Sequence, residues 1–150
     1  MKKTDIAYMA GIFDGEGCIA IHDRKYARKD GTIATHAYAE INFANTNEWV
    51  VRHFLFNFGG NVYLRKKQTG STQPIWAWQI CSKASITPLK ILLPFLKIKH
   101  EQAKIALAFQ TQKNPTNRQP LSILQEEEQS SIKRRISFLN RPFRKKEGET

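Results

Sequence analysis

Several features that mark common protein classes are missing from this sequence. Only two cysteines occur among the 150 residues, Cys18 and Cys81, and neither belongs to a CxxC pair. A disulfide framework is therefore excluded, and a reducing, intracellular compartment is expected. No apolar run approaches the roughly 20 residues that a membrane span needs. No low-complexity tract or internal repeat is present either.

Acidic residues are also scarce, because 13 Asp and Glu stand against 24 Lys and Arg, which gives a net charge of +11. A charge of this size attracts polyanions, so nucleic acid is the favoured partner and an anionic membrane surface the alternative. A hydrophobic fraction of 41% with nine Phe excludes a disordered basic tail. We expect one domain over residues 1–140 and a flexible basic tail over 141–150.

Hydrophobic periodicity predicts the order helix, strand, strand, helix, strand, strand, helix, followed by further C-terminal helices. The first helix should be capped by Thr4 or Asp5 and end at Gly15 and Gly17. The other predicted elements are strands over 18–24, 35–45, 61–67 and 75–82, and helices over 51–58, 86–96, 98–109 and 121–139. This is an α+β domain with one four-stranded antiparallel sheet. One sheet face should be covered by helices, and the other should be polar and free to meet a ligand.

Residues 9–17, MAGIFDGEG, are physically unusual for a helix. Ala10 and Gly11 are small, and Gly inside a helix costs about 1 kcal/mol relative to Ala. Close approach of a second helix usually offsets such a cost. Asp14 and Glu16 lie at the C-terminal end of the helix, where the helix dipole is already negative. Acids in that position favour a cation, and a hard divalent metal with oxygen ligands suits them.

This stretch resembles the LAGLIDADG motif of homing endonucleases over all of its nine positions. A second segment, 93–103, resembles the family's Pro-aromatic-Leu-x-x-Lys segment after the fourth strand. A weaker similarity covers 43–47 and 58–60. The resemblance extends over roughly residues 5–112. It implies a single-motif member with an αββαββα fold and a saddle-shaped sheet.

The resemblance implies an intron- or intein-encoded enzyme that hydrolyses both strands of a long, near-palindromic DNA duplex. Glu16 would bind the catalytic Mg²⁺ (or Mn²⁺, with Ca²⁺ as a non-activating substitute), and the backbone carbonyl of Gly15 would also contact metal. Lys99 matches the basic residue beside the scissile phosphate, and Asn45 matches the residue that orders active-site water. Asp14 would have a structural role at the helix end. Glu16 stands where Asp is commoner in the family, and the family's usual Arg after Asn45 is not evident.

One motif supplies one metal-binding acid, whereas cutting a duplex needs two active sites. A chain with two motifs would need about twice this length, so we expect a homodimer that pairs through the motif helix. The predicted interface residues are Met9, Ala10, Gly11, Phe13 and Asp14.

The resemblance places the sheet in the DNA major groove, where base edges specify the sequence and phosphates position the protein. Strand alternation predicts the outward, DNA-binding residues His22, Arg24, His36, Tyr38, Glu40, Asn42, Tyr63, Arg65, Lys67, Ala77 and Gln79. A loop with Arg24, Lys25, Arg28 and Lys29 should follow the DNA backbone.

Two alternatives share this fold: an intron RNA maturase, and a DNA-binding regulator that has lost cleavage. The presence of Glu16 together with Lys99 favours the nuclease, but RNA stays open as a partner. No membrane partner is expected. The compartment would be the cytoplasm of a bacterium or phage host, or an organelle matrix or stroma.

Overall fold

A computed structural model describes residues 1–65, 73–112 and 122–141 of the chain. The helices are α1 (Lys3–Glu16), α2 (Glu48–Phe58), α3 (Ile86–Leu92), α4 (His100–Gln112) and α5 (Ile123–Leu139), with 3-10 turns at Ser82–Ser85 and Leu93–Phe95. The strands are β1 (Gly17–Ala27), β2 (Ile33–Asn45), β3 (Asn61–Leu64) and β4 (Trp76–Cys81). The predicted element order and the α+β class are confirmed. None of the described helices is long and apolar enough to cross a membrane.

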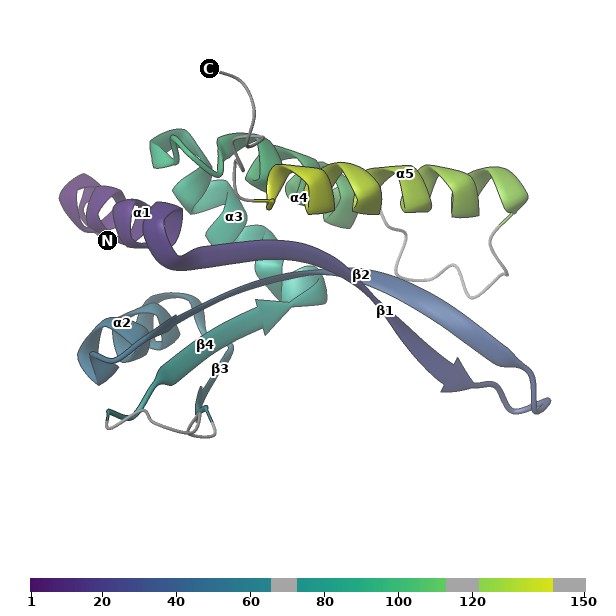
Figure 1. Ribbon diagram of the computed structural model, residues 1–150, viewed down its shortest axis with the longest axis horizontal. Coiled ribbons are helices and arrows are strands. Elements are labelled where there is room, and N and C mark those ends of the chain that lie inside the picture. The colour runs from purple at the N-terminus through teal and green to yellow at the C-terminus, as the bar shows by residue number, and fades with distance from the viewer. Residues whose placement is uncertain (66–72, 113–121, 142–150) are drawn as a thin grey trace, which may run out of the picture.

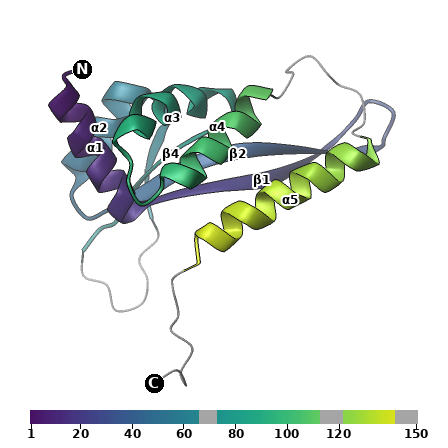
Figure 2. The same ribbon diagram turned by 90° about the horizontal axis from the view of Figure 1, so that it is seen from above.

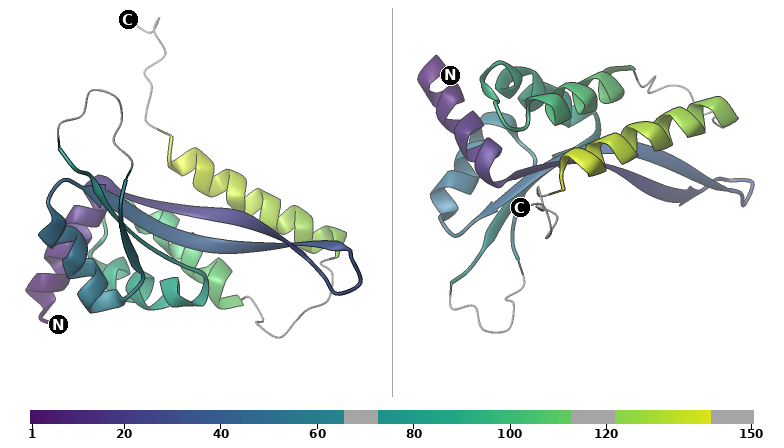
Figure 3. Two further views of the ribbon diagram at one scale, coloured as in Figure 1. Left: turned by 90° about the horizontal axis from the view of Figure 1, so that it is seen from below. Right: turned by 45° about the horizontal axis from the view of Figure 1, so that its top comes forward.

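The four strands form one antiparallel sheet in the order β1-β2-β4-β3. The β1–β2 hairpin extends well beyond the short strands β3 and β4 (Figure 1). Seen from below, the strands lie in front of α3, α4 and α5 (Figure 3, left), so these helices cover one face of the sheet. Helix α5 runs beside β1 and contacts it (Figure 2).

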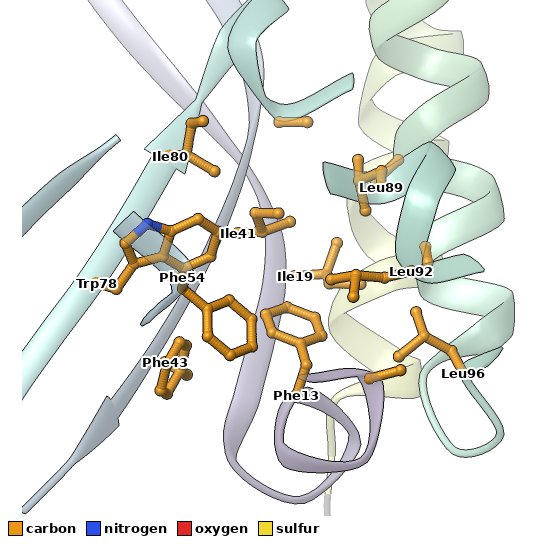
Figure 4. Close-up of a cluster of buried hydrophobic side chains, with 14 of the residues drawn as sticks. Phe13, Ile19, Ile41, Phe43, Phe54, Trp78, Ile80, Leu89, Leu92 and Leu96 are labelled. Carbon is orange, nitrogen blue, oxygen red and sulfur yellow. The ribbon is translucent and has the colours of Figure 1, made fainter. Parts of the chain in front are cut away.

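The core lies between this covered face and the helices. Alternate residues of β2 point into it, as their two-residue spacing predicts: Ala37, Ala39, Ile41 and Phe43 are all buried. Aromatic rings fill the space at one end, where the Phe54 ring centroid lies 4.4 Å from that of Phe43 and 5.3 Å from that of Trp78. Leucines of α3 meet Phe13 of α1 and Ile19 of β1 at the other end (Figure 4).

Several predicted boundaries are wrong. The N-cap residue of α1 is Lys2 and not Thr4 or Asp5. Asp5 lies in the first turn, where its carboxylate accepts the Lys2 backbone N–H at 3.2 Å. Strand β1 continues to Ala27, because cross-strand pairing with β2 extends into a segment too polar to look like a strand. The helix predicted over 86–96 ends at Leu92, and Pro94 lies in a 3-10 turn. The predicted interhelical linker at 114–120 and nearly all of the predicted tail lie outside the described residues.

Candidate active site and nucleic-acid interface

The last residue of α1 meets the last residue of β2. The Asn45 side-chain Nδ2 donates to Glu16 Oε2 at 2.6 Å, although the two residues are 29 positions apart. The Asn45 amide is held from its other side, since Oδ1 accepts the Asn47 backbone N–H at 2.7 Å. Glu16 is exposed. An oriented carboxylate is therefore presented to solvent at the C-terminal end of the motif helix.

The second motif acid points the other way, into the protein. Asp14 is only 8% exposed, and its two carboxylate oxygens accept the backbone N–H groups of Lys97 at 2.7 Å and Lys99 at 2.9 Å. The Lys99 ammonium in turn donates to the backbone carbonyl of Asp14. A cation near the last carbonyls of a helix is favourable because that end carries partial negative charge. Asp14 thus fixes the 97–99 loop and brings Lys99 to the helix end that carries Glu16.

The two faces of α1 differ in what they contact. Met9, Ala10 and Phe13 have no exposed surface, and Asp14 is nearly buried, so all four belong to the domain's own core. Side chains without exposed surface cannot reach a second copy in this structure, so Met9, Ala10 and Phe13 do not fit their predicted place in a dimer interface. The exposed residues of α1 are Lys3, Thr4, Ala7, Tyr8, Gly11, Gly15 and Glu16. A Cβ atom added at Gly11 would meet nothing within 4 Å, so no contact with the described residues requires glycine there.

No protein-family model matches the sequence, and no curated protein matches it. Solved structures match it well. The homing endonuclease I-CvuI in complex with its target gives a TM-score of 0.68 at 22% identity, over 95% of this chain and 87% of that one. The archaeal intron-encoded homing endonuclease I-Vdi141I, complexed with DNA, gives 0.70 at 13% identity, over 98% and 91%. The LAGLIDADG homing endonuclease I-LtrWI gives 0.60 at 14% identity, over 90% and 45%.

The chain has the LAGLIDADG homing endonuclease fold. The resemblance seen in the sequence is therefore confirmed for the fold, and α1 carries nearly all of the stretch that resembles the motif. This helix ends where β1 begins, so Glu16 lies beside the first strand of the sheet.

The uncovered face of the LAGLIDADG sheet carries most of the predicted DNA-binding residues. Cross-strand pairing places these side chains on that face: His22, Arg24, His36, Tyr38, Glu40, Asn42, Tyr63 and Gln79. The Arg24 guanidinium lies 5.2 Å from the centroid of the Tyr38 ring. Arg65 is exposed just after β3, and its backbone N–H donates to the Ile75 carbonyl at 2.8 Å. Lys67 lies outside the described residues.

The structure places two of the predicted DNA-binding residues differently from the prediction. Ala77 shares the uncovered face by register but has no exposed surface, so its side chain is not available to DNA. Lys25 lies in β1 and not in a loop, and alternation puts it on the face of Asp23, opposite Arg24. The Asp23 carboxylate pairs with the Lys133 ammonium of α5.

The tip of the β1–β2 hairpin keeps Arg28 and Lys29 at the far end of the sheet. The Arg28 backbone N–H donates to the Thr32 carbonyl at 2.7 Å, which closes the loop. Asp30 accepts hydrogen bonds from the Thr32 hydroxyl and backbone N–H, and these bonds hold the pKa of the Asp30 carboxyl below its ordinary value. Lys29 is exposed.

A cavity of about 370 Å³ lies beside Lys99 of the candidate site. It is lined by Gly17, Cys18, Ile98 and Lys99 together with the end of α5. Burial raises the pKa of the Cys18 thiol, and the positive charge of Lys99 partly offsets that rise. Cys18 is therefore a neutral thiol at the edge of the site.

The sequence-based interpretation missed two features. Asn61 pairs with Gln79, which pairs with Asn42, so three amides form one row across the uncovered face. Extending the alternation two residues back from Tyr63 would have found Asn61. The bonds between Asp14 and the 97–99 loop had no signal in the sequence, because they join residues more than 80 positions apart.

Proposed function

We propose that the protein is a site-specific DNA endonuclease that hydrolyses both strands of a near-palindromic duplex with Mg²⁺ or Mn²⁺. The observation that carries this proposal is the convergence of an acid, an amide and an amine, Glu16, Asn45 and Lys99, at one end of α1. These groups come from three distant segments and lie next to an uncovered sheet face. The DNA complexes of the proteins with similar structures add support.

The donor set fits a hard divalent cation. The Asn45 amide engages Glu16 Oε2, which leaves Oε1 for another partner, and Gly15 contributes a carbonyl in the last helical turn. A divalent ion held there would supply an activated water and stabilise charge on the phosphate. The Lys99 ammonium would stabilise the negative charge that develops on the phosphate oxygens. Ca²⁺ is expected to bind without supporting cleavage.

A homodimer would complete the site. Among the described residues, no three His, Cys, Asp or Glu side chains are grouped so that they could hold a metal. Two copies of α1 packed on the face of Ala7, Tyr8, Gly11 and Gly15 would bring two Glu16 carboxylates together. Gly11 supports this arrangement, because its cost of about 1 kcal/mol in a helix is not explained by any contact within the described part of the chain.

The uncovered sheet face would then lie in the major groove, with Arg24 and Asn42 among the base-reading residues and Lys29 on phosphate. A net charge of +11 supports binding of a polyanion. An enzyme that cuts DNA must be in the same compartment as its target. The proposed compartment is therefore the cytoplasm of a bacterium or phage host, or an organelle matrix or stroma.

The proposal is tested by incubating the protein with a library of randomised duplexes and Mg²⁺ and sequencing the cut ends. We expect discrete products from the parent and none from Glu16→Gln, which should still bind DNA. Glu127→Gln on the exposed face of α5 is a matched loss of one acid and should cut like the parent.

Equal cutting by Glu16→Gln would contradict the assignment of the active site. Specific duplex binding without cutting by the parent would favour the regulator. Tighter binding to a structured intron RNA than to any duplex would favour the maturase.

A further inference from the structure

One carboxylate lies in the middle of the surface that we propose binds DNA. Glu40 is on β2, and its side chain is 16% exposed. Its Oε1 atom accepts a hydrogen bond from Asn42 Nδ2 at 2.9 Å and lies 3.9 Å from His22 Nε2. A carboxylate on such a surface repels phosphate, so its presence there calls for a physical reason.

The cross-strand neighbours of Glu40 are small. Register places Ala20 on one side of it and Cys81 on the other. The Glu40 side chain is therefore largely buried between the strands, and its Oε1 atom already accepts a hydrogen bond from Asn42. This placement favours contact with a neighbouring side chain over contact with a base edge.

A carboxylate that binds an amide decides which way the amide faces. A side-chain amide has an oxygen that accepts and a nitrogen that donates, and the two ends have nearly the same shape. An ionised carboxylate only accepts, so it holds the amide nitrogen and excludes the flipped orientation. In this protein the held nitrogen is Asn42 Nδ2.

We infer that Glu40 is a positioning residue that sets base specificity through Asn42. With Nδ2 held, Asn42 keeps Oδ1 and one N–H for a partner, which is the acceptor–donor pair that matches adenine N6 and N7. Glu40 then contributes orientation and not a base contact of its own. This inference rests on the proposed function, because it deepens how the same surface would read DNA.

The test is a binding selection on randomised duplex sites with the parent, Glu40→Gln, Asn42→Ala and the double variant. For the parent we expect adenine to be favoured by about tenfold at one symmetric pair of positions. Glu40→Gln keeps the shape but can donate as well as accept, so the Asn42 amide can flip. The preference at that pair should fall to about twofold or less, with the other positions unchanged.

The double variant separates orientation from a general structural effect. If Glu40 acts through Asn42, then Glu40→Gln should change nothing further once Asn42 is alanine. In the free protein, the Asn42 side-chain NH₂ resonances should shift in Glu40→Gln, which needs no DNA. Glu127→Gln should leave both readouts as in the parent.

An unchanged preference in Glu40→Gln would overturn the inference while leaving the proposed function in place. An equal loss at all positions, or a further loss on top of Asn42→Ala, would also overturn it. A parent that reads no duplex site would overturn the proposed function and this inference together.

Discussion

Loss of charge at the two acids of the motif helix should affect different properties: at Asp14 it should mainly lower the stability of the fold, and at Glu16 it should mainly abolish cleavage. Asp14→Asn is nearly isosteric, but the parent carboxylate accepts two backbone N–H groups, at 2.7 and 2.9 Å, in a site that is 8% exposed. The asparagine oxygen can accept only one of them, and its NH₂ group faces the other. The 97–99 loop therefore loses one hydrogen bond to a charged acceptor and keeps a weaker one.

The magnitude follows from these contacts. Hydrogen bonds to charged groups contribute about 1.5–3 kcal/mol, and a buried donor left without a partner costs about 1–3 kcal/mol. We expect Asp14→Asn to lower the free energy of unfolding by about 2–4 kcal/mol. A loss of about 3 kcal/mol corresponds to a fall in Tm of roughly 6–12 °C for a domain of this size.

Glu16→Gln is the matched control, two residues along the same helix. Glu16 is exposed and makes one hydrogen bond, to Asn45, so its loss should change the free energy of unfolding by about 1 kcal/mol or less. Urea unfolding followed by tryptophan fluorescence, to which the buried Trp78 contributes, measures both variants, and similar m values keep them comparable.

In a cleavage assay the order of the two variants should be reversed, with Glu16→Gln the more severely affected. Glu16→Gln should be folded and inactive, whereas Asp14→Asn should keep Glu16, the acid proposed to bind metal, but cut slowly in single turnover, because the loop that places Lys99 is loosened. The reasoning is refuted if Asp14→Asn unfolds within about 0.5 kcal/mol of the parent, the range expected of an ordinary surface substitution. It is refuted equally if Glu16→Gln is the more destabilised variant.

The remaining predictions concern charge, assembly and recognition. Lys99→Met should lower the single-turnover cleavage rate by about 10²-fold with little change in affinity, and a weaker complex with an unchanged rate at saturation would make Lys99 a plain phosphate contact. Gly11→Leu should convert a sedimenting dimer into monomer, since overpacking costs about 1–3 kcal/mol in each copy; a parent that stays monomeric on its cleaved DNA would contradict the dimer. Arg24→Ala should relax base preference at one or two symmetric positions. Lys29→Ala should weaken binding to all duplexes alike and lower, by about one, the steepness with which the logarithm of the binding constant falls with the logarithm of salt concentration. The same uniform loss in both variants would show that the sheet does not read bases.

Local patterns determined which face of each strand is buried. Ala37, Ala39, Ile41 and Phe43 alternate with polar residues, and a two-residue period needs no knowledge of what covers the strand. The acid at the end of the motif helix was also visible in the sequence, since its unfavourable place beside the helix dipole depends only on neighbouring residues.

Long-range packing decided what these local patterns could not. Small and apolar residues occur on several faces of α1, so the sequence does not reveal which face packs against the domain's own core. The structure places Met9 and Ala10 in the core and leaves Gly11 exposed. Ala77 lies on the polar face by alternation, yet its neighbours bury it.

The candidate site itself is a product of tertiary structure. The sequence supplied Glu16, Asn45 and Lys99 as separate candidates with roles taken from a resemblance. Only the pairing of strands and the bonds from Asp14 to a loop 85 positions away brought those three groups to one end of α1. Spacing along a chain fixes how neighbouring side chains alternate, but contacts between distant segments depend on how the whole sheet and its helices pack.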